Sequence, residues 1–171
     1  MELKVVFIGD GAVGKTSLLR SYLNLGLPLM MTIGVDFYRV KIDEKIGLII
    51  WDLGGQEHFR PFVKDFIKGA SVVVLAFDQS RPDTFDNIKK YWEPLILEVL
   101  GDQVPVILVG NKIDLAEIIS EDLVQQYIQH SKLNIKGYVK TSALQKKGLD
   151  VLFEKIKEAV YELIKQAKAS Q

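Results

Sequence analysis

The chain contains no cysteine among its 171 residues. This absence excludes disulfide bonds, thiolate zinc sites and cysteine nucleophiles, and it removes every thiol-linked lipid anchor. Prolines are few, five in all, and hydrophobic residues make up 48% of the chain, which is the composition of a folded protein and not of a disordered segment. We expect a single domain spanning residues 1–171, because domains cluster at about 100 to 200 residues.

Neither sign of charge is in excess, since 22 lysines and arginines balance 22 aspartates and glutamates. Such a chain lacks the long-range positive field that draws proteins to phosphate backbones, so we expect no nucleic-acid partner. Long apolar runs are also missing. Ser71–Phe77 and Val104–Val109 have the length of strands, whereas a membrane-spanning helix needs about 20 residues. The N-terminal segment Met1–Asp10 lacks the pattern of a secretion signal, and we expect a cytoplasmic protein.

Short apolar stretches alternate with longer segments of helical periodicity. This alternation predicts an α/β fold in which helices cover both faces of a mostly parallel sheet. The polar link Asp43–Lys45 between the second and third strands is too short for a helix, so these two strands form an antiparallel hairpin. Pro94 predicts a kink in the third helix. The expected strands are Leu3–Gly9, Val35–Ile42, Leu48–Leu53, Val72–Asp78, Val104–Gly110 and Tyr138–Lys140, and the expected helices are Lys15–Asn24, Arg60–Lys68, Asp83–Leu100, Ser120–His130 and Lys147–Ala167.

The most specific motif is GDGAVGKT at Gly9–Thr16, which matches G-x-x-x-x-G-K-[ST] and lies between the first predicted strand and the first predicted helix. In this context a glycine-rich backbone wraps around an anion, so that its amide hydrogens converge on the β-phosphate of a nucleotide. Lys15 supplies a cation for the β- and γ-phosphates, and the Thr16 hydroxyl can ligate Mg²⁺. A chance match is rare, on the order of one chain in a hundred, so we interpret the motif as a phosphate loop.

A second cluster, Asn111-Lys112-Ile113-Asp114, follows the fifth predicted strand, at the edge where doubly wound sheets bind ligands. The Asp114 carboxylate can accept hydrogen bonds from N1 and N2 of guanine, whereas adenine offers no matching donor pair. Lys112 can lie along the base, and Asn111 can connect this loop to the phosphate loop. The amides of Thr141-Ser142-Ala143 can approach O6 of guanine. Each segment alone is compatible with an ordinary turn, but together with the phosphate loop they predict guanine binding.

A third cluster, WDLGGQE at Trp51–Glu57, ends the third predicted strand. Asp52 can hold a water on Mg²⁺, and the N–H of Gly55 can bond a γ-phosphate oxygen only while that phosphate is present. Gln56 can then orient the attacking water. The alternative is a flexible strand exit with a solvated glutamine.

Together these motifs resemble those of small GTPases of the Ras superfamily, over almost the whole chain. Thr32–Phe37 is similar to the first switch of Rab-like members, in which a threonine ligates Mg²⁺ and its amide meets the γ-phosphate. Trp51–Gln56 is similar to the Arf type in its paired glycines. The resemblance implies an α/β P-loop NTPase three-layer sandwich, with a six-stranded, mostly parallel sheet, one antiparallel edge strand and five helices. It also implies that Gly11 leaves room for Gln56 and for the arginine of an activating partner.

Motif chemistry and resemblance together imply the following site. The catalytic residues are Gln56, Lys15, Thr32 and Gly55, and the magnesium ligands are Thr16, Thr32 and Asp52. The nucleotide-binding residues are Gly11, Ala12, Val13, Gly14, Lys15, Thr16, Ser17, Thr32, Asp52, Gly55, Asn111, Lys112, Asp114, Ser142, Ala143 and Leu144. The expected cofactor is Mg²⁺ with GTP or GDP as the bound nucleotide. The expected partners of a monomeric switch are a GTPase-activating protein, an exchange factor and effectors.

The sequence departs from the family between the phosphate loop and the first switch. This segment is shorter than in typical members and lacks the aromatic residue that packs against guanine, for which Leu25, Leu27 and Pro28 are the nearby replacements. We therefore expect weaker base packing and faster nucleotide exchange. The apolar stretch Leu23–Met31 predicts either an adaptable partner surface or ordinary core, and Trp51 has the same two interpretations.

Membrane attachment by lipid is not expected, because the C-terminal region has no cysteine and residue 2 is Glu2 where myristoylation requires glycine. The apolar stripe of Lys147–Lys168 predicts a helix that packs on the sheet.

Two other functions stay open at this point. One is a GTP-binding scaffold that hardly hydrolyses, against which Gln56 argues. The other is a small-molecule kinase, which needs a lid with arginines, whereas Arg20, Arg39, Arg60 and Arg81 are scattered along the chain. Because the first switch has no arginine, we expect unaided hydrolysis on the order of 10⁻⁴ s⁻¹.

Overall fold

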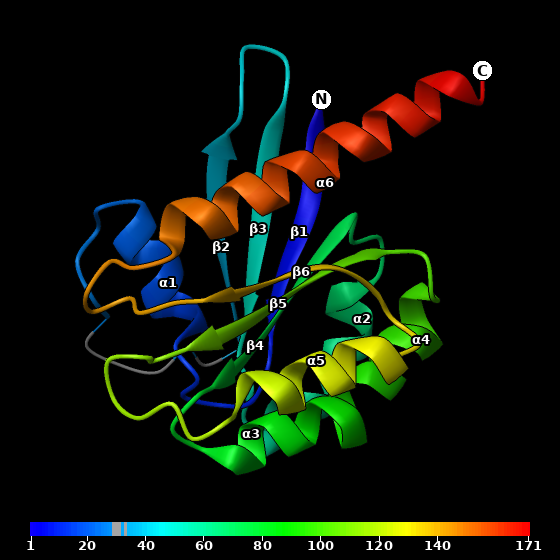
Figure 1. Cartoon of the computed structure of the whole chain (residues 1–171). Coiled ribbons are helices and arrows are strands. Elements are labelled where there is room, and N and C mark those ends of the chain that lie inside the picture. Colours follow the sequence, from blue (N-terminus) through cyan, green and yellow to red (C-terminus); the bar gives the residue numbers. More distant parts are fainter. Residues whose placement is uncertain (29–31, 33) are drawn as a thin grey trace.

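The structure is a computed structural model that describes residues 1–28, 32 and 34–171. In these residues six strands form one sheet in the order β2-β3-β1-β4-β5-β6 (Figure 1). Strand β2 pairs antiparallel with β3, and every other neighbouring pair is parallel. The strands are β1 (Glu2–Ile8), β2 (Val35–Lys41), β3 (Gly47–Leu53), β4 (Val72–Asp78), β5 (Pro105–Asn111) and β6 (Asn134–Lys140). The predicted mixed sheet with an antiparallel edge is confirmed.

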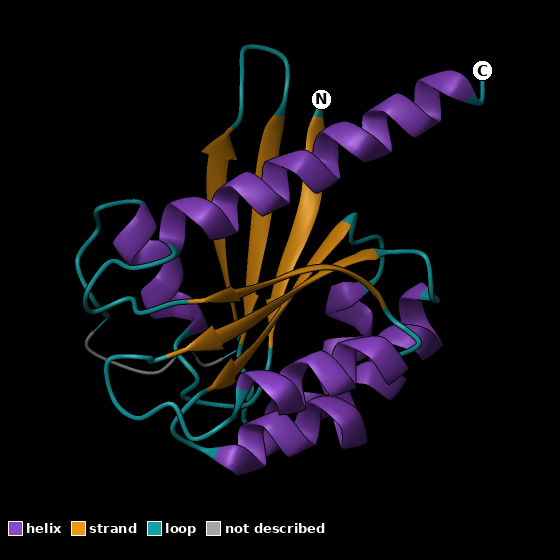
Figure 2. Cartoon of the chain, in the orientation of Figure 1, coloured by secondary structure: helices purple, strands orange, loops and turns teal. Residues whose placement is uncertain are grey.

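The helices form a layer on each face of the sheet (Figure 2). One buried cluster joins the sheet to α1 (Lys15–Tyr22) and α6 (Leu149–Ala169). A second cluster joins the opposite face to α2 (Arg60–Ile67), α3 (Pro82–Asn87), α4 (Glu93–Leu100) and α5 (Glu121–His130). All residues of β4 and β5 are buried, as expected for central parallel strands that are covered on both faces.

The third helical segment departs from the predicted Asp83–Leu100 helix. It runs as α3, a π-helical turn at Ile88–Trp92 and then α4, without a gap. Pro94 lies in the first turn of α4, where its missing N–H is tolerated. The kink predicted at Pro94 stays a prediction, and the irregularity that the structure shows is the π turn just upstream of it. When α3 and α4 are counted as one interrupted helix, the described residues contain the five predicted helical segments.

Most other boundaries differ from the prediction by one or two residues. The exception is β6, which begins at Asn134 and not at Tyr138. Its first residues pair with β5 across a register shift between Val106 and Ile107, so the irregular pairing extends the strand beyond its apolar part.

Helix α6 packs on the sheet through the apolar stripe that the sequence predicted. Leu152, Phe153, Ile156 and Val160 are buried in the first cluster. The ring of Phe153 stacks on Tyr22 of α1, with centroids 3.6 Å apart. Among the described residues, no helix combines the length and the apolar character that crossing a bilayer requires.

Candidate functional site

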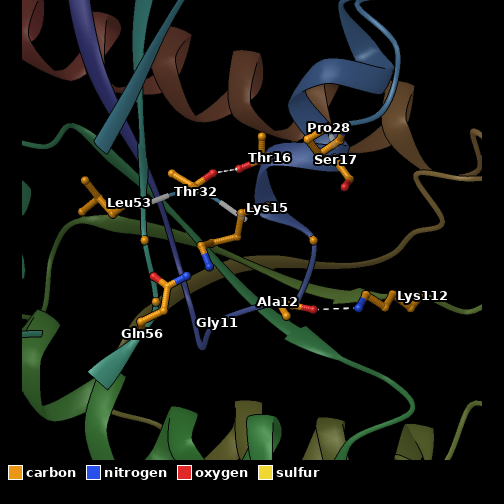
Figure 3. A pocket seen from close by; sticks show the side chains of 13 residues that line it. Gly11, Ala12, Lys15, Thr16, Ser17, Pro28, Thr32, Leu53, Gln56 and Lys112 are labelled. Carbon is orange, nitrogen blue, oxygen red and sulfur yellow. Dashed lines mark hydrogen bonds between the residues drawn. The ribbon is translucent and has the colours of Figure 1, made fainter. Parts of the chain in front are cut away.

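The phosphate loop lies at the carboxyl end of β1 and leads directly into α1. It borders a cavity of about 310 Å³ that also receives residues from the first switch segment, around Thr32, and from Gly54–Lys68, which we name the second switch segment (Figure 3). The lining residues are Gly11, Ala12, Gly14, Lys15, Thr16, Ser17, Pro28, Thr32, Leu53, Gly54, Gly55, Gln56 and Lys112. The cavity thus brings together the predicted catalytic residues and most of the predicted phosphate-binding residues.

The Lys15 ammonium lies beneath its own loop. Its Nζ donates to the carbonyls of Gly9 (3.1 Å) and Asp10 (3.0 Å). Burial lowers the pKa of Lys15 to about 8, although the charges of Asp52 and Asp10 act to raise it and that of Arg81 acts to lower it. Lys15 is therefore a cation at neutral pH, held in a position where an anion in the cavity can meet it.

Three oxygen-bearing side chains converge beside the loop. The Thr16 hydroxyl contacts both the Thr32 hydroxyl and Oδ2 of Asp52 at short range, and Thr32 Oγ1 lies 3.4 Å from the same Oδ2. Burial raises the pKa of Asp52 to about 6, against hydrogen bonds from Thr16 and Thr32 that lower it. Its Oδ1 is buried without a hydrogen-bond partner among the described residues. Hydroxyl and carboxylate oxygens suit Mg²⁺, so this donor set fits the predicted metal.

The second switch segment lies directly against the phosphate loop. A Cβ added at Gly55 would lie 2.1 Å from the Gly9 carbonyl oxygen, so only glycine fits there. Gln56 follows and lines the cavity, with its Oε1 buried and unpaired among the described residues. The amide of Gln56 is therefore available to a group bound in the cavity.

A second cavity of about 220 Å³ adjoins the first and shares Gly14, Ser17 and Lys112 with it. It also receives the predicted base-reading residues Asn111, Asp114, Ala143 and Leu144, together with Leu27 and Leu115. The two cavities therefore lie side by side, and together they extend from the switch segments to the loop after β5.

Side-chain hydrogen bonds hold the base-reading loops together. Asn111 donates to the Val13 carbonyl (2.9 Å), which confirms the predicted connection to the phosphate loop. Thr141 donates to Asn111 Oδ1 (2.9 Å), and Ser142 donates to Asp114 Oδ1 (2.7 Å). Because a carboxylate oxygen accepts more than one hydrogen bond, Asp114 can still receive two donors from a base.

The apolar stretch after α1 is divided in the structure. Leu23 packs against the first core cluster, whereas Leu25 and Leu27 are 50% and 46% exposed. Arg20 fixes this segment, because its guanidinium donates to the carbonyls of Leu25 (2.8 Å) and Gly26 (3.0 Å). Leu27 thereby reaches the base cavity, at the place where the family resemblance implies an aromatic. Leu29–Met31 of this stretch and Ile33 of the first switch lie outside the described residues.

Trp51, for which packing and partner binding were both open, lies half-buried in an aromatic cluster. Its ring meets Phe37 edge-on, with centroids 4.8 Å apart, and lies 6.0 Å from Phe66 of α2. The Lys4 ammonium lies 3.6 Å from the centre of the same ring. Phe37 is exposed, so the cluster is both packed and accessible.

Asp10 occupies a variable position of the loop motif, and its structural role was not predicted from the sequence. Its buried carboxylate accepts from Arg60 of α2 (3.1 Å), Asn87 of α3 (2.6 Å) and Trp92 of the π turn (2.8 Å). The Arg60 guanidinium also lies 4.4 Å from the ring centre of Tyr91. Asp10 therefore connects the phosphate loop to α2, which belongs to the second switch segment and which we name the second switch helix. Only the fold brings these partners together.

Comparison with known proteins agrees with this geometry. The model of the Ras family matches residues 4–162. The chain is 34% identical to "Ras-related protein Rab-1" of Theileria parva, over 98% of the chain and 80% of that protein. It is 33% identical to "Ras-related protein Rab7" of Drosophila melanogaster (97% and 84%) and 33% identical to "Ypt/Rab-type GTPase Rab7" of Neurospora crassa (90% and 80%). These relatives agree with the Rab-like resemblance, whereas the Arf-like resemblance of Trp51–Gln56 stays a prediction.

Replacing Asp10 tests whether its buried carboxylate stabilises the fold. Asp10→Ala leaves three donors without their acceptor, so we expect the free energy of unfolding to fall by about 3 to 5 kcal/mol in urea titrations. Asp65→Ala removes an exposed carboxylate that pairs with Lys68 on the surface, and it should cost about 1 kcal/mol or less. Equal losses in the two variants would contradict this assignment.

Proposed function

Because the chain belongs to the Ras family, and is therefore a GTP-hydrolysing enzyme, we propose that it is a molecular switch formed by one domain of residues 1–171. In this proposal it binds GTP with Mg²⁺, hydrolyses it to GDP and phosphate, and changes its affinity for partner proteins. The observation that carries the proposal is the pair of adjoining cavities, of which Gln56 lines one and Asp114 lines the other.

The roles of the residues follow from their places in the site. The phosphate loop and Lys15 bind the phosphates, and Asp114 selects guanine through its carboxylate. Thr16, Thr32 and Asp52 would hold Mg²⁺, which supplies positive charge to the phosphate oxygens. Gln56 orients the attacking water, and the N–H of Gly55 bonds the γ-phosphate.

The residues that line the first cavity support a nucleotide-dependent change in the two switch segments. Thr32 comes from the first switch segment and Gly54–Gln56 from the second, so both segments border the place of the terminal phosphate. Loss of that phosphate removes contacts from both segments at once. Order in the two segments would then depend on the bound nucleotide, as in other switches of this kind.

We place the partner-binding surface on the aromatic cluster between the switch segments, formed by Phe37, Trp51, Phe59, Phe62 and Phe66. Phe37 and Phe62 are both 56% exposed, which supports contact with a partner. The cluster joins β2 and β3 to the second switch helix, so an ordering of that helix changes the shape of the surface. A GTPase-activating protein and an exchange factor are the further partners that a slow switch requires.

Substitution of Gln56 separates a switch from a GTP-binding scaffold. Gln56→Leu cannot orient the water, so single-turnover hydrolysis of GTP should slow by about tenfold or more, with little change in GTP affinity. Gln125→Leu alters an exposed glutamine of α5 and serves as the control. A wild-type rate equal to that of Gln56→Leu would favour the scaffold.

Substitution of Asp114 tests the choice of base. In Asp114→Asn the amide can donate to the 2-oxo group of xanthine but no longer accepts two hydrogen bonds as an anion. Competition binding should show affinity for GDP falling by about 10- to 100-fold while affinity for XDP rises. Asp122→Asn on the exposed first turn of α5 is the matched control. An unchanged preference for guanine nucleotides in Asp114→Asn would contradict the role proposed for Asp114.

Leu27 tests the expected weak packing of the base. Leu27→Phe adds an aromatic ring at the base cavity, so GDP dissociation should slow by about 2- to 10-fold in stopped-flow measurements. Leu25→Phe makes the same change at an equally exposed leucine that does not line that cavity. Equal effects of both variants would show that general hydrophobicity, and not the place of Leu27, controls exchange.

A further inference from the structure

Ala12 adopts a backbone conformation that is unusual for a residue with a side chain. Its φ is +61°, in the left-handed region where a Cβ crowds the following carbonyl and where glycine is the ordinary occupant. Ala12 is exposed, so its methyl group gains no core packing in return. A conformation of this kind persists where neighbouring groups hold it.

The peptide groups on both sides of Ala12 are held by cations. Arg81, at the start of α3, donates from Nη2 to the Gly11 carbonyl at 2.8 Å. Lys112 donates from Nζ to the Ala12 carbonyl at 2.6 Å, as Figure 3 shows. The Gly11 carbonyl belongs to the peptide that φ of Ala12 rotates, and the Ala12 carbonyl belongs to the peptide that ψ rotates. The two bonds therefore fix both backbone angles of Ala12.

One buried carboxylate holds the two cations. Asp78, the last residue of β4, places Oδ2 at 3.2 Å from Arg81 Nε and at 3.3 Å from Lys112 Nζ, and its side chain is 2% exposed. Its Oδ1 accepts from the backbone N–H (2.8 Å) and the hydroxyl (2.6 Å) of Ser80. We name Asp78, Arg81 and Lys112 the Asp78 clamp. The clamp connects the end of a central strand to two successive carbonyls of the phosphate loop.

The direction of the Gly11 carbonyl decides the direction of an amide. The structure contains no cis peptide bond among its described residues, so the N–H of Ala12 points opposite to the Gly11 carbonyl. Arg81 binds that carbonyl, while Gly11 and Ala12 border the phosphate cavity and Arg81 does not. The N–H of Ala12 is thereby turned away from Arg81, at a residue that lines the cavity. A cationic donor on the carbonyl also polarises the peptide and strengthens its N–H as a donor.

We propose that Arg81 is a positioning residue of the phosphate loop, which holds Ala12 in its left-handed conformation so that the loop is ready to receive the phosphates of a nucleotide. The inference rests on the proposed function, because it assigns Arg81 to the same nucleotide site. Arg81 lies outside every motif that the sequence analysis used. The Arg81 side chain is 40% exposed, and its guanidinium acts on the nucleotide through the Gly11–Ala12 peptide and not by contact.

The test combines loss of Arg81 with removal of the Cβ at residue 12. In Arg81→Ala, the loop occupies its competent conformation for only part of the time, so the dissociation constant for a fluorescent GDP analogue should rise by about tenfold. Glycine enters the left-handed region without cost. In the Ala12→Gly background, Arg81→Ala should therefore raise that constant by less than about threefold. The quantity compared is the effect of Arg81→Ala in the two backgrounds.

A residue that only stabilises the fold would give the same effect in both backgrounds, and that result would overturn the proposal. Arg39→Ala removes an arginine whose side chain is 78% exposed and pairs with Glu2, and it should leave GDP binding unchanged. If Arg81→Ala does not fold, Arg81→Lys takes its place, because lysine keeps the charge but not the fork that reaches both Gly11 and Asp78. Arg81→Lys should raise the dissociation constant for GDP by less than Arg81→Ala does, and this increase should again be smaller in the Ala12→Gly background.

The amide proton of Ala12 gives a direct second readout. In GDP-bound protein, Arg81→Ala should move its NMR resonance upfield, because the cation no longer polarises the peptide. If the resonance does not move and the affinity for GDP does not change in Arg81→Ala, the role of Arg81 is contradicted. In that case the proposed function still stands, provided that the wild-type protein binds GDP. Absence of guanine nucleotide binding by the wild-type protein would overturn the proposed function itself, and the role of Arg81 with it.

Discussion

The structure depends on the orientation of the carbonyl groups in one loop. An anion can be bound by backbone amides only if the carbonyls of the same peptides point elsewhere and find donors there. Each carbonyl from Gly9 to Gly14 has such a donor. Lys15 donates to the carbonyls of Gly9 and Asp10. The side chains of Arg81, Lys112 and Asn111 donate to the next three carbonyls in order, and the backbone N–H of Leu18 donates to that of Gly14. The cavity side of the loop is then left to its amides.

These donors come from distant parts of the chain, so the loop also gathers the rest of the site. Hydrogen bonds from Lys112 and Asn111 connect the base-reading loop to the phosphate loop. The bond from Arg60 to Asp10 connects the second switch helix to it. Gly55 lies against the loop so closely that a side chain is excluded. A group bound by the loop is therefore in reach of the base-reading residues and of both switch segments. The close contact between loop and switch gives a physical basis for sensing the terminal phosphate.

Much of this arrangement could be predicted from the sequence, because hydrophobic alternation and motif spacing are local properties. The sheet with its antiparallel edge, the loop after β1 and the meeting of Asn111 with the phosphate loop belong to this part. The π turn could not be predicted, since Pro94 indicates a disturbance but not its form. Asp10, Asp78 and Arg81 were also missed. Their partners lie up to 82 residues away, and no spacing rule predicts such pairs. The first residues of β6, Asn134–Gly137, contain only one apolar side chain, Ile135, which is too few to indicate a strand from the sequence.

In the proposed switch, the amides of the phosphate loop bind a guanine nucleotide whose terminal phosphate orders the two switch segments. Amide hydrogen exchange measured with GDP and with a non-hydrolysable GTP analogue tests it most directly. We expect slower exchange with the analogue at the backbone of residues 54–60, and no difference in α5, none of whose residues lines either cavity. Equal exchange in both nucleotide states, or equal protection by adenine nucleotides, would contradict the account.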